Sequence, residues 1–162
     1  MDEVDRIVVA WRRERPDLDV SPLEVLSRVT RLARHLDRAR SAAFARHGLV
    51  TWEFDVLAAL RRSGEPYQLS AGQLVGQTMV TSGTMTNRVD RLAARGLVRR
   101  LPDPADGRGV MVRLEDGGRQ LADAALADLL GIESGLLGVL EPARRQDLSG
   151  LLRDLLTTFD PS

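Results

Sequence analysis

Arg108 stands between Gly107 and Gly109 in the stretch DPADGRG, where its neighbours carry no side-chain bulk. A guanidinium on such a tip can enter the narrow minor groove of a DNA duplex, whose negative potential attracts arginine. Asp106, two residues earlier, can hold the Arg108 side chain in an extended pose through a charge-assisted hydrogen bond. The pattern predicts that Asp106 and Arg108 together form a minor-groove contact.

A second set of polar residues lies in TSGTMTNRVDRLAARG, whose apolar residues recur on one face at helical spacing. Thr84, Asn87 and Arg91 therefore point away from that face. Asn pairs bidentately with adenine and Arg with guanine in a major groove, whereas hydroxyls at helix starts suit phosphate oxygens. The predicted DNA contacts are Ser70, Thr81, Ser82, Thr84, Asn87, Arg91, Asp106 and Arg108.

Charge is unevenly distributed along the 162 residues, although the formal net charge is zero. Residues 81–114 hold seven arginines against three acids, a net charge of +4. Residues 115–162 hold four arginines against nine acids, a net charge of −5. The positive charge therefore lies where the DNA contacts are predicted.

Several classes of function are disfavoured by what the sequence lacks. It has no cysteine, and its two histidines, His35 and His47, lie in one predicted helix without a second cluster of ligands. We therefore expect no enzymatic activity, metal site or cofactor. The N-terminal residues contain no apolar run long enough for a signal peptide or a membrane span, so we expect a cytoplasmic protein without a membrane partner.

Helices are predicted on both sides of the basic segment. Val4, Ile7, Val8 and Trp11 form the apolar stripe of a short helix that ends before Pro16. Ser21-Pro22-Leu23-Glu24 predicts a capping box that starts a long helix running to about His47, before Gly48. A further helix is expected from Thr51 to Gly64, with Trp52, Val56, Ala59 and Leu60 on one face.

The basic segment itself predicts two short helices and a hairpin. Ser70 and Gln73 form a capping box for the first helix, and Thr81 or Ser82 caps the second, which ends at Gly96. Two partly alternating runs, 97–101 and 110–114, flank the DPADGRG tip and predict a two-stranded hairpin. The order is that of a winged helix-turn-helix, a mainly α fold with a small β-hairpin wing.

Leucine-rich helices are expected from about Glu115 and again from Pro142 to the end. They carry more leucine than one small core can absorb, which is typical of a subunit interface. We expect a two-fold homodimer formed through the N- and C-terminal helices. The predicted domains are the N-terminal helices (1–47), the winged helix-turn-helix (48–114) and the C-terminal dimerisation helices (115–162).

The run TSGTMTNRVDRLAARGLVRRLPDPADGRGVMVRL resembles the multiple antibiotic resistance regulator (MarR) family, and the helix order extends the resemblance over nearly the whole chain. The resemblance implies a dimeric DNA-binding transcription factor, commonly a repressor released by small molecules. The extra N-terminal helix with Trp11, followed by WRRERPDLDVSP, is similar to the branch that includes the urate-responsive regulators and the aconitate-responsive TamR group. The expected operator is an inverted repeat with half-sites about 34 Å apart.

The same branch surrounds its ligand with a tryptophan, an aspartate and two arginines, which match Trp11, Asp55, Arg88 and Arg100 in this sequence. The resemblance therefore implies a small anionic effector, urate or a tricarboxylate such as trans-aconitate. Arg88 lies about 60° from the inner face of its helix, counting 100° per residue, and Asp55 is a plausible partner for it. An anion pulling on Arg88 would move the helix and lower DNA affinity.

Two alternatives remain open from the sequence. In one, Trp11 only anchors the first helix and an Asp55–Arg88 salt bridge only stabilises the fold. In the other, the chain is a winged-helix module that binds proteins and responds to no ligand, because this fold does not by itself imply DNA binding. A steep salt dependence of DNA binding would separate the DNA-binding and protein-binding functions.

Overall fold

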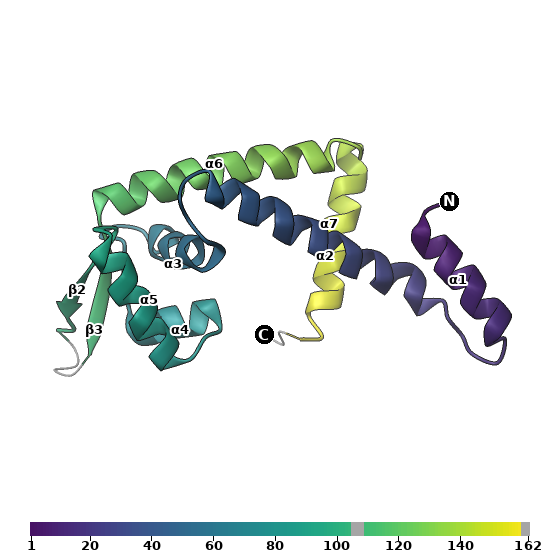
Figure 1. Cartoon of the computed structure of the whole chain (residues 1–162), viewed down its shortest axis with the longest axis horizontal. Helices are drawn as coiled ribbons and strands as arrows, with labels where there is room; N and C mark the ends of the chain where they lie inside the picture. The colour runs from purple at the N-terminus through teal and green to yellow at the C-terminus, as the bar shows by residue number, and fades with distance from the viewer. Residues whose placement is uncertain (105–108, 160–162) are drawn as a thin grey trace. The chain divides into compact units, whose positions relative to one another are not determined.

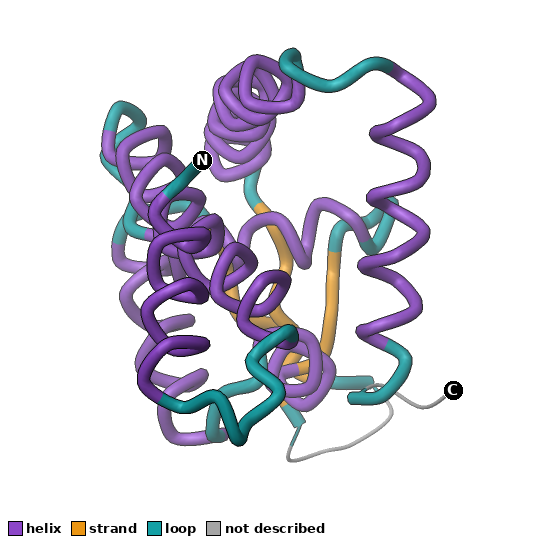
Figure 2. Tube along the Cα trace, turned by 90° about the vertical axis from the view of Figure 1, so that its right-hand side faces the viewer, coloured by secondary structure: helices purple, strands orange, loops and turns teal. Residues whose placement is uncertain are grey.

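Helices make up most of the chain, and one small antiparallel sheet interrupts them (Figures 1 and 2). The computed structural model describes residues 1–104 and 109–159. By internal contacts the chain forms two compact units, Met1–Thr51 and Trp52–Ser162. The elements are α1 (Glu3–Glu14), α2 (Pro22–Ala45), α3 (Thr51–Arg62), β1 (Gln68–Ser70), α4 (Ala71–Thr78), α5 (Ser82–Ala94), β2 (Val98–Pro102), β3 (Val110–Leu114), α6 (Asp116–Leu137) and α7 (Pro142–Leu156). The predicted mainly α fold with a small β wing is confirmed.

In the first unit α1 packs on α2 through a small apolar cluster of Val4, Val8 and Val20, beside Leu23. Val4 and Val8 are buried as the stripe predicts, and Ile7 is half-buried. Trp11 is 49% exposed, so the predicted stripe stops one turn short of it.

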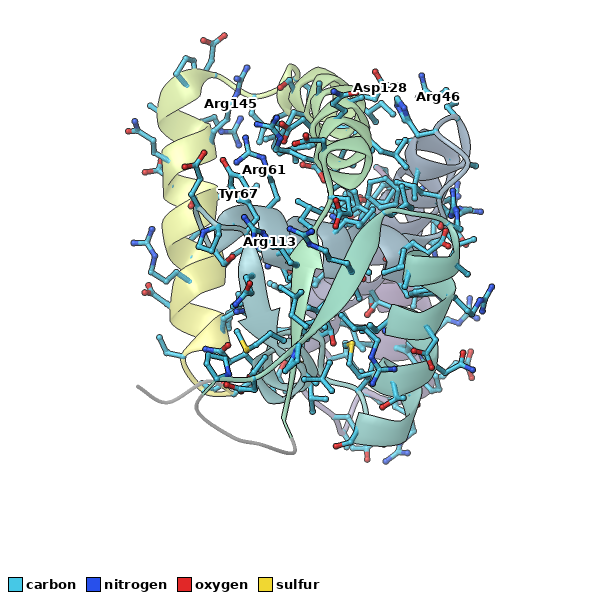
Figure 3. The ribbon with its side chains drawn as sticks, turned by 90° about the vertical axis from the view of Figure 1, so that its left-hand side faces the viewer. Arg46, Arg61, Tyr67, Arg113, Asp128 and Arg145 are labelled. Atoms are coloured by element: carbon cyan, nitrogen blue, oxygen red, sulfur yellow. The ribbon has the colours of Figure 1, made fainter. Side chains whose placement is uncertain are left out.

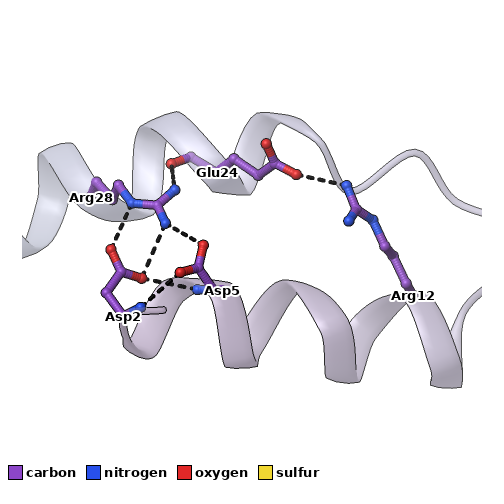
Figure 4. A network of polar contacts seen from close by, with 5 residues as sticks. All are labelled: Asp2, Asp5, Arg12, Glu24 and Arg28. Carbon is purple, nitrogen blue, oxygen red and sulfur yellow. Dashed lines mark hydrogen bonds and ion pairs between the residues drawn. The ribbon is translucent and has the colours of Figure 1, made fainter.

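A polar network reinforces this helix pair (Figure 4). Arg28 of α2 donates from Nε to Asp2 Oδ2 over 2.8 Å and from Nη2 to Asp5 Oδ1 over 2.5 Å. Asp2 and Asp5 also form the capping box of α1. The hydrogen bond from Arg28 lowers the pKa of Asp2 to about 2. Arg12 adds a 2.6 Å hydrogen bond to the carboxylate of Glu24.

The start of α2 corrects one prediction. Pro22 is at the first helical position as expected, but Ser21 has helical dihedral angles and makes no capping hydrogen bond from its side chain. Its hydroxyl instead lies 3.0 Å from Asp19 Oδ2. Since Glu24 is taken by Arg12, the predicted capping box between Ser21 and Glu24 is wrong.

The second unit buries side chains from its helices and its sheet. On α3, Val56, Ala59 and Leu60 are buried as predicted, but Phe54 and Leu57 are buried too, so α3 is covered on more than one face. Trp52, predicted on the inner face, is only half-buried. The other buried side chains include Leu74, Met85, Val89, Leu92, Val98, Val112 and Leu114.

The sheet has three strands in the order β1-β3-β2, all antiparallel. The predicted hairpin is present as β2 and β3, with Arg99 opposite Arg113 and Arg100 opposite Val112. The sequence predicted no strand at 68–70, but Gln68 pairs with Arg113 there and extends the wing by one strand.

The helices α6 and α7 expose many large apolar side chains. α7 has no buried residue, and a cavity of about 490 Å³ lies beside its leucines and Leu137 of α6. The exposed leucines are Leu126, Leu130, Leu136 and Leu137 on α6 and Leu151, Leu152, Leu155 and Leu156 on α7. Among the described residues, none of the helices is both long and apolar enough to cross a membrane.

Candidate nucleic-acid interface

The helix α5 has one buried and one exposed face. Met85, Val89 and Leu92 are at most 3% exposed, as the sequence pattern predicts. Its N-cap is Thr81, whose hydroxyl accepts from the Thr84 backbone N–H over 3.3 Å. Since the apolar face fixes the rotation of the helix, the side chains of the opposite face must point outward.

The outward face carries donors suited to a nucleic acid. Thr84, Asn87 and Arg91 are exposed, and Ser82 and Thr81 lie at the positive end of the helix dipole. A surface depression of about 400 Å³ is lined by Trp52, Gly83, Thr84, Asn87, Arg88 and Arg91. The lining residue Gly83 has no heavy atom near the position of a Cβ, so the surface is open there.

Trp52 organises the two arginines of this depression. The guanidinium carbon of Arg88 lies 5.2 Å from the indole ring centroid and that of Arg91 lies 5.1 Å from it. Both distances allow cation–π attraction, which holds the guanidinium groups at the surface of α5. Sequence reasoning missed this role, because it placed Trp52 in the core and Arg88 beside Asp55. In the described structure the Arg88 guanidinium lies over the Trp52 indole.

Two ion pairs fix α5 against its neighbours. Near its C-terminus Arg95 donates to Glu53 of α3 over 2.7 Å, and the Glu53 side chain is only 7% exposed. On the outer side Asp90 accepts from Arg100 of β2 over 2.5 Å, where both partners are substantially exposed. These pairs connect α5 to α3 and to the wing.

The preceding helix α4 is positioned by its own cap. Ser70 Oγ accepts from the Gln73 N–H over 3.1 Å, and Gln73 Oε1 accepts from the Ser70 N–H over 2.8 Å, which confirms the predicted capping box. The turn to α5 contains Met79 in the left-handed region at φ 52°, with its side chain 89% exposed. The pair α4 and α5 is a helix-turn-helix, as predicted from the sequence.

Just beyond the paired strands the two sides of the wing remain in contact. The Asp103 N–H donates to the Gly109 carbonyl over 3.1 Å, and a Cβ at Gly109 would lie 2.7 Å from Asp103 Cβ. Glycine is therefore the residue that permits this close approach. The predicted contacts Asp106 and Arg108 fall at 105–108, outside the described residues.

The predicted ligand residues differ in burial and in the compact unit to which they belong. Asp55 and Arg88 are half-buried on α3 and α5, and Arg100 is exposed and paired with Asp90. Trp11 belongs to the other compact unit and is about half exposed. The described residues hold no group of three or more histidine, cysteine or acidic side chains that could bind a metal ion.

Comparison with known proteins gives consistent matches. Residues 47–109 match the model of the MarR family. The transcriptional regulator PecS of Dickeya dadantii is 39% identical over 150 residues, which cover 93% of this chain and 90% of PecS. The structure of a mutant MarR from Escherichia coli complexed with operator DNA aligns with a TM-score of 0.71 at 25% identity, covering 86% of this chain and 99% of that one. BpsR of Bordetella bronchiseptica, from a structural study of how 6-hydroxynicotinic acid regulates its DNA binding, aligns with a TM-score of 0.61 at 32% identity, covering 79% and 98%.

Proposed function

Since this chain belongs to the MarR family of transcriptional regulators, we propose that it is a ligand-released repressor that binds an inverted-repeat operator as a homodimer. The observation that carries the proposal is the outer face of α5, where Asn87 and two arginines braced on Trp52 surround an open depression. The aligned structure of MarR with operator DNA supports the same use of the fold.

In the proposed complex α5 enters the major groove. Asn87 pairs with adenine and Arg91 with guanine, because their side chains match the donor and acceptor patterns of these bases. Thr81, Ser82 and Thr84 at the start of α5, with Ser70 at the start of α4, contact backbone phosphates. Arg108, braced by Asp106, enters the adjacent minor groove from the wing tip.

The exposed leucines of α6 and α7 support the proposed dimer. Leu151, Leu155 and Leu156 are between 45% and 63% exposed, an arrangement that favours burial against a second subunit. Sedimentation velocity of Leu155→Glu tests this: we expect the dimer to dissociate, while Gln146→Glu at an exposed polar position of α7 keeps it. A dimeric Leu155→Glu protein would contradict an interface through α7.

The proposed effector is a small anion, urate or a tricarboxylate such as trans-aconitate, that binds through Arg88 and Arg100 near Asp55. The relation of BpsR to 6-hydroxynicotinic acid supports control by a small organic molecule. Two guanidinium groups offer forked donors to a carboxylate, and taking them from Trp52 and Asp90 would shift α5. DNA affinity then falls by the difference between the effector's affinities for the two states.

The test is binding to the intergenic DNA upstream of the protein's own gene, measured over a range of salt concentrations. We expect the logarithm of the association constant to fall steeply with the logarithm of the salt concentration, because phosphate contacts release counterions. Arg91→Ala should weaken binding by about 1–3 kcal/mol and relax specificity, while Arg62→Ala on the exposed end of α3 should not. A flat salt dependence would favour a protein-binding role.

Urate and trans-aconitate should weaken DNA binding by the unaltered protein, and they should weaken it less in Arg88→Ala. If neither compound changed DNA binding, the proposed effectors would be refuted.

A further inference from the structure

A polar cavity of about 370 Å³ lies at the base of the wing, and none of the residues proposed to bind DNA or effector lines it. We call it the wing-root cavity. It is formed where the segment before β1, the outer side of β2 and β3, and the first turn of α6 meet. Its lining residues are Glu65, Pro66, Tyr67, Arg99, Arg113, Leu114, Glu115, Asp116 and Arg119.

Tyr67 lies among arginines at this cavity (Figure 3 labels Tyr67, Arg61 and Arg113). The guanidinium carbon of Arg61 is 5.0 Å from its ring centroid and that of Arg119 is 6.0 Å from it. Arg61 is held from behind by a 2.8 Å hydrogen bond to Asp123 of α6, which raises the pKa of Arg61. The guanidinium groups of Arg61 and Arg119 are therefore held next to the Tyr67 ring.

The register of the sheet adds to this concentration of charge. Arg99 and Arg113 are directly opposite each other on neighbouring strands. Like charges in such a pair are destabilising unless something compensates them. Glu115 compensates Arg99 through a 3.0 Å ion pair. Arg113 is half-buried, and its side chain makes no hydrogen bond or ion pair in the described part of the chain.

Arg119 provides a second unused donor. Its Nε is buried and has no hydrogen-bond partner among the described residues, while its Nη2 makes a 3.3 Å contact to Asp116. A buried N–H without an acceptor is costly. A water molecule could accept from Arg119 Nε, but it would not neutralise the charge of Arg113. An oxyanion could do both, because its oxygens take hydrogen bonds from guanidinium donors.

The backbone around the cavity is closely packed. A Cβ on Gly118 of α6 would lie 2.2 Å from the Leu97 carbonyl oxygen, and the Glu115 N–H donates to the same oxygen over 3.0 Å. The start of α6 is therefore fixed against the segment leading into β2. A preformed site of this kind loses little entropy when a ligand binds.

We propose that the wing-root cavity binds a small oxyanion, a carboxylate or a phosphate, through Arg113 and Arg119. The cavity volume lies near the lower end of the range for small-molecule sites, about 300–1,000 Å³. Its lining contains three arginines and three carboxylates, so it has no excess charge to attract a polyanion such as DNA. What it offers is unpaired donors at defined positions, which suits a small ligand.

Titration calorimetry of the full-length protein tests the proposal, with sodium phosphate and sodium succinate as separate probes and ionic strength held constant with sodium chloride. We expect saturable binding of at least one probe, and the two titrations distinguish phosphate from carboxylate. Arg113→Gln should weaken that binding about tenfold, because it removes charge-assisted hydrogen bonds. Arg113→Lys should weaken it less, because it keeps the charge but loses the planar fork.

Arg62→Gln is the matched control, since it removes one exposed arginine of the same unit that does not line the cavity. Arg119→Gln is the second variant, and circular dichroism verifies the fold of each protein. The proposal is overturned if neither probe saturates, if Arg113→Gln and Arg119→Gln bind as the unaltered protein does, or if Arg62→Gln weakens binding equally. Loss of DNA binding by Arg113→Gln in anion-free buffer, with phosphate binding retained, would instead assign this arginine to the duplex.

Discussion

Replacing Trp52 by leucine tests whether the indole, by holding Arg88 and Arg91 in place, strengthens DNA binding. The ring lies 5.2 Å from the guanidinium carbon of Arg88 and 5.1 Å from that of Arg91. Each cation–π contact at an exposed site contributes about 0.5–1 kcal/mol. Immobilising a long side chain costs about 0.5–1.5 kcal/mol, so losing the platform for two arginines should cost about 1–2 kcal/mol of binding free energy. Operator binding should therefore weaken five- to thirtyfold.

Fluorescence anisotropy with a labelled upstream fragment measures the change, and Trp52→Phe serves as the matched control because it keeps a smaller aromatic face. The order of affinity should be Trp52, then Phe, then Leu. A double-mutant cycle with Arg91→Ala should give a coupling energy of at least about 0.5 kcal/mol. Tighter DNA binding by Trp52→Leu would refute the reasoning, because it would mean that the arginines must leave the indole before they reach the bases.

Three other predictions concern the wing, the core and the N-terminal helix. Arg108→Ala should weaken operator binding and lower the slope of the logarithm of the association constant against the logarithm of the salt concentration by about one. Anisotropy between low and moderate salt measures this slope. An unchanged slope would exclude a phosphate or minor-groove contact. Glu53→Gln should lower the free energy of unfolding in urea by about 1–2 kcal/mol, because it weakens an ion pair with Arg95 in which the Glu53 carboxylate is buried. Glu141→Gln, at an exposed position, should change it little. Asp2 has its pKa lowered to about 2 by Arg28, so its contribution to stability is complete above its usual pKa of 3.8 and is lost as the pH falls through 2. Thermal melts from pH 5 to pH 2 should show this loss, and Asp2→Asn should be less stable at pH 5 and lose less stability on acidification. Identical acid profiles would argue against a stabilising Asp2–Arg28 ion pair.

Predictions from sequence succeeded where the determinant was local. The capping box of Ser70 and Gln73 and the N-cap at Thr81 involve residues three positions apart, and both are present. Gly48, Gly64 and Gly96 end their helices with positive φ, a conformation that glycine adopts without strain. In each case the signal and the structure it specifies lie within one turn of backbone.

Predictions failed where a competing partner decided the outcome. Ser21 has the sequence context of a cap, but Asp19, two residues earlier, holds its hydroxyl, and Arg12, twelve residues before Glu24, holds the Glu24 carboxylate. The strand β1 has three residues and exists because β3 lies beside it, so no local periodicity reveals it. The pairing of β1 with β3 and the pairing of Glu24 with Arg12 both depend on the tertiary structure, whereas Asp19 is a local competitor for the Ser21 hydroxyl.

The candidate site shows the same division. The helical wheel placed Thr84, Asn87 and Arg91 on the outer face, and they are exposed there. The wheel also turned Arg88 toward the body of the protein, and the residue is half-buried. What the wheel could not supply is the partner: Trp52 lies thirty-six residues away from Arg88 in sequence, and periodicity assigned it to the core.

The contacts that hold α5 indicate how an effector could release DNA. The Asp90–Arg100 pair is substantially exposed on both sides, so it contributes about 0–1 kcal/mol. The contact of Arg88 with Trp52 contributes a similar amount, which brings the sum to about 2 kcal/mol at most. That sum lies within the 1–3 kcal/mol by which effectors typically change affinity. An anion that binds both arginines would break both contacts and could therefore account for the loss of DNA affinity. The Glu53–Arg95 pair has a buried carboxylate and holds the C-terminal end of α5 in place, so the expected motion is a pivot of the N-terminal end of α5 about that anchor.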